Sequence, residues 1–122
     1  TIINQAVAGK ETIELGNVSV RRDFTYVSDL CNAIIHLSAR NESIGEIVNI
    51  GLNSDVSILE LFEIINDCVK KDLKLYVAEE MVRDNNSEIS IVRCDNSKLI
   101  QLGFRPKVSI KEGIELTINS IL

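Results

Sequence analysis

Two neighbouring arginines, Arg21 and Arg22, are the side chains of this sequence best suited to hold an anion. They stand at the outer end of a stretch whose alternating apolar residues predict a half-buried strand that leads into a helix. A guanidinium group is always charged and can donate two hydrogen bonds to one phosphate, so an arginine here is a ready phosphate anchor. Position alone favours the alternative, which is a solvated arginine that pairs with Asp23.

The other side chains that could carry chemistry have simpler explanations. His36 is the only histidine, and no other residue sets up a catalytic pair or a metal cluster with it, so a histidine on a helix surface is expected. Asp29 and Asp95 both stand at predicted helix starts, where capping of backbone amides accounts for them. We therefore predict no catalytic and no metal-binding residue in this chain.

Composition excludes several classes of partner. The chain has 122 residues, of which 13 are basic and 18 acidic, and its net charge is -5. Nucleic acids and membrane surfaces are bound by basic faces, so neither is expected as a partner. The three cysteines form no Cys-x-x-Cys pair, which favours buried thiols in a reduced, cytoplasmic protein. The length and the start at Thr1 indicate one unit over 1–122 that is a piece of a longer protein.

Helices and short strands alternate along the chain, which predicts an α/β fold. The expected helices lie at 1–8, 28–39, 57–69, 95–102 and from 109 onward. The expected strands lie at 12–15, 18–27, 46–51, 73–78 and 90–93, with loops at 41–45 and 79–88. Gly16 and Asn17 separate the first two strands, which predicts that these strands pair as a hairpin.

Several helix starts carry capping signals. Ser57 is followed three residues later by Glu60, a pair typical of a capping box, and the same pattern recurs at 109–112. Ser28 or Asp29 can cap the helix over 28–39. The apolar stripes expected to face inward are Leu30, Ala33, Ile34 and Leu37 in the helix over 28–39, and Leu61, Ile64, Ile65 and Cys68 in the helix over 57–69.

Short motifs follow one another in order over almost the whole chain. They are GK at 9–10, Gly16, RDFTYVSD at 22–29, VNIG at 48–51, VSILEL at 56–61, DNSK at 95–98, LGFRP at 102–106, and Ser109, Glu112 and Gly113. This series resembles the C-terminal portion of the extended short-chain dehydrogenase/reductase family, the NAD-dependent epimerases and dehydratases of nucleotide sugars. The resemblance implies an α/β substrate lobe with short strands and about four to five helices, without the N-terminal Rossmann domain.

In this family, the upstream domain holds the cofactor and the catalytic groups. A Gly-x-x-Gly-x-x-Gly turn cradles the cofactor pyrophosphate, and a Tyr-x-x-x-Lys pair moves a proton. The glycines of this sequence lack that spacing, and the residues four positions after Tyr26 and Tyr76 are Leu30 and Glu80. The resemblance therefore implies that the full-length enzyme uses NAD or NADP, and that this chain alone neither binds the cofactor nor transfers a hydride.

The resemblance also assigns residues that bind the substrate, a nucleotide-diphosphate sugar. Arg22 matches the family arginine that contacts the diphosphate, whereas Arg21 is expected to be a surface residue. Arg83 matches a second such arginine, although its loop, RDNN, lacks the proline and glycine of the family. A polar-loop arginine is the alternative for Arg83, and Arg93 is a rival for its role.

Ile13 and Leu15 lie where the family walls the nucleotide base. Alternating aliphatic residues of a strand also pack in cores and at sheet edges, so plain packing is the alternative. The family often has an aromatic residue at the position of Leu15, and this sequence departs from the pattern there.

Two functions of different classes follow. In the first, the chain is the nucleotide-sugar-binding lobe of an NAD(P)-dependent epimerase or dehydratase and is not catalytic alone. In the second, it is a stand-alone, non-catalytic module that binds a nucleotide sugar or a protein; a structural role with solvated arginines is a third option. In the first two, the helix over 28–39 and the strand over 48–50 leave an apolar surface. We expect the missing Rossmann domain to cover it, or a homo-oligomer to form through it.

Overall fold

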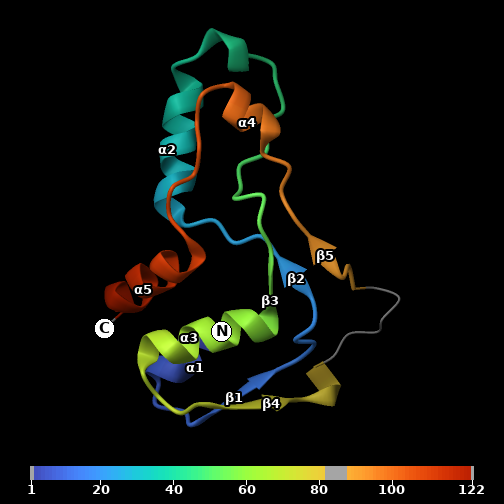
Figure 1. Cartoon of the computed structure of the whole chain (residues 1–122), viewed down its shortest axis with the longest axis vertical. Helices are drawn as coiled ribbons and strands as arrows, with labels where there is room; N and C mark the ends of the chain where they lie inside the picture. Colours follow the sequence, from blue (N-terminus) through green and yellow to red (C-terminus); the bar gives the residue numbers. More distant parts are fainter. Residues whose placement is uncertain (1, 82–87, 122) are drawn as a thin grey trace.

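The computed structural model describes residues 2–81 and 88–121 and shows a body from which a narrower arm extends (Figure 1). The body holds α1 (Ile2–Val7), β1 (Thr12–Leu15), α3 (Ile58–Val69), β4 (Lys74–Val77), the 3-10 helix η2 (Glu79–Met81) and α5 (Ile110–Ile121). The arm holds α2 (Val27–Ser38), the 3-10 helix η1 (Asn41–Ser43) and α4 (Ser97–Gln101). Between them lie β2 (Arg21–Arg22), β3 (Val56–Ser57) and β5 (Ile91–Val92). The predicted α/β class is confirmed.

The hydrophobic core lies where α1, β1, α3 and α5 meet. Its buried side chains are Ile2, Ala6, Ile13, Leu15, Phe62, Ile65, Leu73, Ile114 and Ile118. The stripe predicted for α3 faces this core, and Ile65 retains only 2% of its exposure. Phe62, next to that stripe on the helix, is also buried in this core.

The start of α3 is the capping box that the sequence predicts. The hydroxyl of Ser57 accepts a hydrogen bond from the Glu60 amide (3.1 Å), and the Ser57 amide donates to Oε2 of Glu60 (2.6 Å). The helix ends at Lys70, whose φ of 53° is left-handed. The predicted helix over 57–69 is therefore confirmed at both ends.

The predicted hairpin over 12–27 is wrong, because β1 pairs in parallel with β4. A two-residue hairpin turn needs a positive φ at its first central residue, and neither Gly16 nor Asn17 has one. Instead, Oδ1 of Asn17 accepts hydrogen bonds from the amide (3.0 Å) and the hydroxyl (2.7 Å) of Ser19. This local turn sends the chain away from β1, and the strand expected over 18–27 shrinks to the two residues of β2.

The second sheet has β2 at its centre, between β3 and β5. β3 runs antiparallel to β2 and places Ser57 opposite Arg21. β5 runs parallel to β2 and places Val92 opposite Arg22. Each strand contributes only two residues to this ladder, so main-chain pairing is scarce around the two arginines.

The strand predicted over 46–51 is not formed, because no strand pairs with this segment in the described part of the chain. Side chains hold it instead. The amide of Leu52 donates to Oδ1 of Asp23 (3.1 Å), and Nδ2 of Asn96 donates to the Gly51 carbonyl (2.8 Å). Gly51 also lies against Cys94, since a Cβ at residue 51 would come within 2.7 Å of the Cys94 sulfur.

Asp29 is not the cap of α2, contrary to the prediction for it and for Ser28. The N-cap position belongs to Tyr26 and carries no side-chain capping bond. The carboxylate of Asp29 is 3% exposed and accepts hydrogen bonds from the amides of Lys107 (2.9 Å) and Val108 (2.8 Å). It therefore tethers α2 to the segment that leads into α5.

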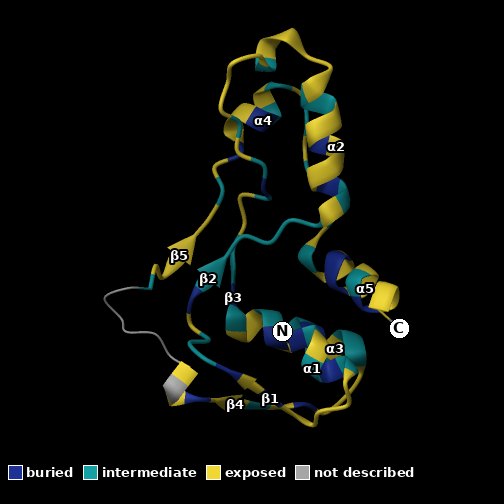
Figure 2. Ribbon diagram, turned by 180° about the vertical axis from the view of Figure 1, so that it is seen from behind, coloured by how far each residue is buried: buried dark blue, intermediate teal, exposed yellow. Residues whose placement is uncertain are grey.

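The buried stripe predicted for α2 is also wrong in part. Ala33 is fully buried, but Leu30 is 40% exposed and Ile34 is 53% exposed. The exposed apolar surface continues through Ile35 and, beyond η1, through Ile47, which is 86% exposed. Figure 2 shows the arm largely in the colour of exposed residues. The apolar pattern of α2 thus marks a face that no described residue covers.

His36 connects α2 to the end of α4 and is not the plain surface histidine expected. Its Nε2 lies 2.8 Å from the Leu102 carbonyl oxygen, and its ring centroid lies 5.5 Å from that of Phe104. The Nε of Arg40 lies 2.7 Å from the same imidazole nitrogen. That nitrogen can donate to Leu102 or accept from Arg40, but not both at once.

The remaining helices follow their predicted starts. Oδ1 of Asp95 accepts from the amide (3.0 Å) and the hydroxyl (2.5 Å) of Ser97. The N-cap position of α4 belongs to Asn96 and carries no side-chain capping bond, so the cap predicted at Asp95 is wrong. The hydroxyl of Ser109 accepts from the Glu112 amide (3.3 Å) at the start of α5. None of the helices in residues 2–81 and 88–121 is long and apolar enough to cross a membrane.

We expect Asp29→Ala to lower the free energy of unfolding of the chain by about 1–3 kcal/mol, because two amides lose a buried acceptor. Ser28→Ala removes the other predicted cap and is expected to change it by less than about 0.5 kcal/mol. Urea unfolding followed by circular dichroism measures both values. Equal losses in the two variants would contradict the tether.

Candidate functional site

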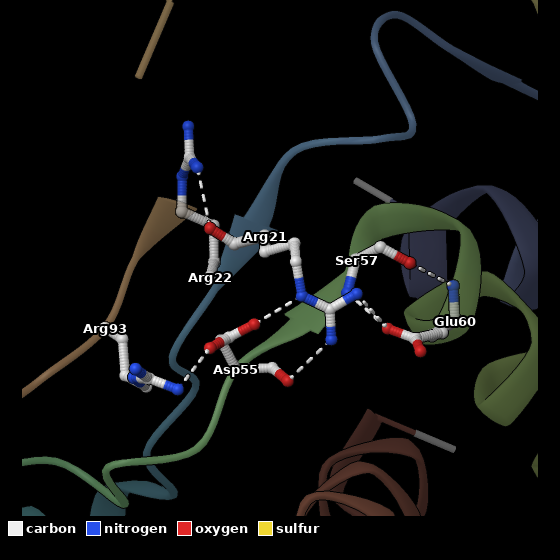
Figure 3. A network of polar contacts seen from close by, with 6 residues as sticks. All are labelled: Arg21, Arg22, Asp55, Ser57, Glu60 and Arg93. Atoms are coloured by element: carbon white, nitrogen blue, oxygen red, sulfur yellow. Dashed lines mark hydrogen bonds and ion pairs between the residues drawn. The ribbon is translucent and has the colours of Figure 1, made fainter. Parts of the chain in front are cut away.

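Arg21, predicted to be a surface residue, is the most heavily bonded arginine of the described chain (Figure 3). Its Nε bonds Oδ1 of Asp55, and its Nη2 donates to the Asp55 main-chain oxygen (3.1 Å). Its Nη1 lies 3.0 Å from Oε2 of Glu60, in the first turn of α3. One side chain of β2 therefore holds both the approach to β3 and the start of α3.

Arg22 is free of such pairing. Its Nη1 donates to the main-chain oxygen of Arg21 (2.7 Å), and within residues 2–81 and 88–121 no carboxylate forms an ion pair with it. The alternative pairing with Asp23 does not occur, because that carboxylate accepts from the amides of Leu52 (3.1 Å) and Cys94 (3.2 Å). Figure 3 shows the Arg22 guanidinium pointing away from Asp55. As far as the described residues go, most of its donors are thus left for another acceptor.

Arg93, the rival candidate, lies on the side of Arg21. Its Nη1 is 3.4 Å from Oδ2 of Asp55, and its side chain is 57% exposed. Residues one apart on a strand face opposite sides of the sheet, and Val92, the neighbour of Arg93, is the residue paired with Arg22. Arg93 and Arg22 are therefore not brought together on one face.

Hydrogen bonds and neighbouring charges stabilise the charged forms of Arg21 and Glu60. The hydrogen bond from Arg21 to Asp55 raises the pKa of the Arg21 guanidinium. Desolvation opposes this rise to a smaller extent, and the charge of Glu60 adds to it. The pKa of Glu60 is lowered, first by the bond from the Ser57 amide, then by the Ser57 hydroxyl and the Arg21 charge.

The two aliphatic residues proposed to wall the base lie in the core. Ile13 is fully buried and Leu15 is 7% exposed. Leu15 also lines an apolar cavity of about 550 Å³ between α1, α3, α5 and the segment 24–26, whereas Ile13 and Arg22 do not line it. The structure therefore separates Ile13 from Leu15, and contact of either with a base stays a prediction.

The remaining candidates give no second binding group. Arg83 lies outside the described residues. Tyr26 packs against Gly113, where an added Cβ would meet the tyrosine Cβ at 3.3 Å, and it lines the same cavity. In the described part of the chain, no cluster of three or more His, Cys, Asp or Glu side chains could hold a metal ion.

The three cysteines occupy three different surroundings. Cys31, expected to be buried, is exposed on α2 because that face of the helix has no covering element among the described residues. Burial raises the pKa of the Cys68 thiol on α3. Burial, and to a smaller extent the charges of Asp23 and Asp95, raises the pKa of the Cys94 thiol.

The sequence did not predict that Arg21 and Asp55 form the ion pair that joins β2 to the start of β3. The two residues are 34 positions apart, and each is flanked by other polar residues. One signal could have revealed the pair. Adjacent residues of a strand point to opposite faces, so Arg21 and Arg22 are expected to have different partners.

The pH dependence of stability should report the Glu60 contacts. Because the native pKa of Glu60 lies below its ordinary value of 4.5, the stabilisation is present above that value and is lost as pH falls through the native pKa. We therefore expect wild type to lose more stability than Glu60→Gln between about pH 6 and about pH 3. Urea midpoints measured along this range test it, and Ser57→Ala should remove part of the same difference. An identical pH slope in wild type and Glu60→Gln would contradict the assignment.

Comparison with known proteins places this geometry in a family. The family model described as GDP-mannose 4,6 dehydratase matches residues 1–117. GDP-L-fucose synthase 1 of Arabidopsis thaliana is 33% identical over 110 residues, which cover 90% of this chain and 32% of that protein. UDP-glucuronic acid decarboxylase 1 of Danio rerio is 33% identical over 117 residues, which cover 96% of this chain and 27% of that protein.

A solved structure shares the fold. It is a mutant UDP-glucuronic acid 4-epimerase from Bacillus cereus in complex with UDP-4-deoxy-4-fluoro-glucuronic acid and NAD. The TM-score is 0.80 at 26% identity, over 99% of this chain and 39% of that one. This chain spans 32% and 27% of the length of the two curated relatives. The chain therefore belongs to the nucleotide-sugar epimerases, dehydratases and reductases of the extended short-chain dehydrogenase/reductase family.

Proposed function

We propose that the chain is the C-terminal substrate lobe of a longer NAD(P)-dependent enzyme and that it grips the diphosphate of a nucleotide sugar through Arg22. The observation that carries this proposal is the state of Arg22. Its guanidinium has no carboxylate partner among the described residues, while the adjacent Arg21 is held by Asp55 and Glu60. Arg22 is also the residue that matches the diphosphate arginine of the family.

The physical role of Arg22 is to supply local positive charge in an acidic chain. The net charge of -5 repels an anionic ligand at long range, so binding depends on a guanidinium close to the phosphates. A forked guanidinium fixes the orientation of a diphosphate as well as its position. The sugar attached to that diphosphate is then held at a defined distance from the reacting groups.

The catalytic groups belong, on this proposal, to the remainder of the longer protein. NAD or NADP, when bound there, accepts and returns a hydride. The B. cereus structure that shares this fold contains both NAD and a nucleotide sugar, which supports one enzyme made of two such parts. A cytoplasmic location, Arg83 as a second diphosphate contact, and Ile13 and Leu15 as the wall of the base pocket complete the proposal.

The uncovered face of the arm supports a contact with the missing domain. Ile34, Ile35 and Ile47 are 53%, 67% and 86% exposed. All three belong to the arm, and exposed apolar side chains gathered in one part of a fold are typical of an interface. We expect this face to be buried against the cofactor domain in the intact enzyme.

Arg22→Ala in the full-length protein should weaken binding of UDP-, dTDP- or GDP-sugars roughly 10- to 100-fold, because charge-assisted hydrogen bonds to phosphate are lost. Isothermal titration of the three ligands against both proteins measures the change. Arg105→Ala is the matched control, since Arg105 is exposed and its loss removes the same charge. Unchanged affinity in Arg22→Ala would refute the proposed role.

The isolated chain should bind an apolar dye and self-associate through the arm. A double variant, Ile35→Gln with Ile47→Gln, should reduce dye fluorescence and shift sedimentation toward monomer, because polar side chains weaken the apolar patch. Ile89→Gln is the control, because Ile89 is 68% exposed but lies next to β5, away from the arm. Wild-type chain that sediments as a monomer without dye binding would contradict the exposed interface.

A further inference from the structure

Asp55 is a nearly buried carboxylate that bonds arginines from two different segments. Its side chain is 9% exposed. Oδ1 accepts from Nε of Arg21 on β2, and Oδ2 lies 3.4 Å from Nη1 of Arg93, directly after β5. Asp55 itself directly precedes β3. One side chain thus joins all three strands of the second sheet (Figure 3).

The main chain alone gives this sheet little rigidity. β2, β3 and β5 are each two residues long. Charge-assisted hydrogen bonds are stronger than the neutral bonds of a ladder, and a buried carboxylate between two cations carries much of the local order. Without Asp55, Arg21 would keep Glu60 as its remaining acidic partner, and Arg93 would lose the one acidic partner it has among the described residues.

Arg22 is coupled to this arrangement through Arg21. Its Nη1 donates to the Arg21 main-chain oxygen at 2.7 Å, so its direction depends on the position of the Arg21 peptide. The Arg21 amide donates to the Ser90 carbonyl (2.8 Å), and its side chain is held by Asp55 and Glu60, so both hold this part of β2 in place. A shift of β2 would therefore move the Arg22 guanidinium directly.

We infer that Asp55 is a positioning residue for the diphosphate: it engages Arg21 and Arg93 on one face and thereby fixes β2, which presents Arg22 on the other face to the phosphates. This inference rests on the proposed function of Arg22. It adds an acidic residue to a site that must bind an anion, because this acid holds the strand that carries Arg22.

The experiment is a double-mutant cycle in the full-length protein. Whichever of UDP, dTDP and GDP binds wild type most tightly is titrated together with its phosphate-free nucleoside. Asp55→Asn should weaken the nucleoside diphosphate about tenfold and leave the nucleoside within about twofold. In an Arg22→Ala background, Asp55→Asn should change the affinity for the diphosphate by less than about twofold, because the group it positions is gone.

Matched variants separate this role from loss of structure. Asp72→Asn removes an exposed acidic charge and should leave both affinities unchanged. Arg21→Lys keeps the charge but cannot bond Asp55 and Glu60 as a fork, so it should reproduce the selective loss even if Asp55→Asn does not fold.

The outcomes separate the positioning role of Asp55 from the diphosphate-binding role of Arg22. Binding of the diphosphate that depends on Arg22 but is unchanged by Asp55→Asn, or by Arg21→Lys, would overturn this inference alone. Equal weakening of nucleoside and diphosphate, or full additivity with Arg22→Ala, would reduce Asp55 to a structural residue. Wild type that binds none of the three diphosphates would overturn the proposed function, and this inference with it.

Discussion

A shortage of main-chain pairing is the constraint on which the rest of this structure depends. The strands of the second sheet are two residues long, and the segment after η1 joins no ladder among the described residues. Carboxylates replace the missing bonds. Asp23 accepts from Leu52 and Cys94, Asp29 accepts from Lys107 and Val108, and Asp55 joins two arginines. Each therefore adds a connection between segments that are distant in the sequence to those that the short strands make.

The same constraint explains why two adjacent arginines differ so much. Because side chains alternate along β2, Arg21 points toward Asp55 and Glu60 and forms ion pairs with both. Arg22 faces the other way and meets only a main-chain oxygen among the described residues. The two adjacent arginines thus differ in their partners because successive side chains of a strand point to opposite faces. On the proposed function, Arg22, which no described carboxylate pairs with, is the arginine that binds the diphosphate.

Local signals predicted the helices well, and non-local pairings escaped prediction. The Ser57 capping box lies within one helical turn, so its residues specify it without help from the rest of the chain. The partner of β1 is β4, far along the sequence, and a plausible turn at Gly16 favoured the wrong partner. Asp29 has the sequence position of a cap, but its acceptors are filled from across the fold. Arg21 was assigned to the surface for the same reason, because Asp55 is 34 residues away.

The three cysteines lie in different parts of the fold, so the rates at which their thiols are labelled report local opening in each part. Cys31 on the arm reacts with an alkylating reagent without any structural change, since it is exposed. Cys94 is pressed against Gly51 beside the Asp23 carboxylate, so its labelling rate reports how often that junction separates. Cys68 packs against the core of the body and reports a different, larger opening. Three residues without assigned chemistry can thus rank the arm, the junction and the core by their stability, with no label introduced.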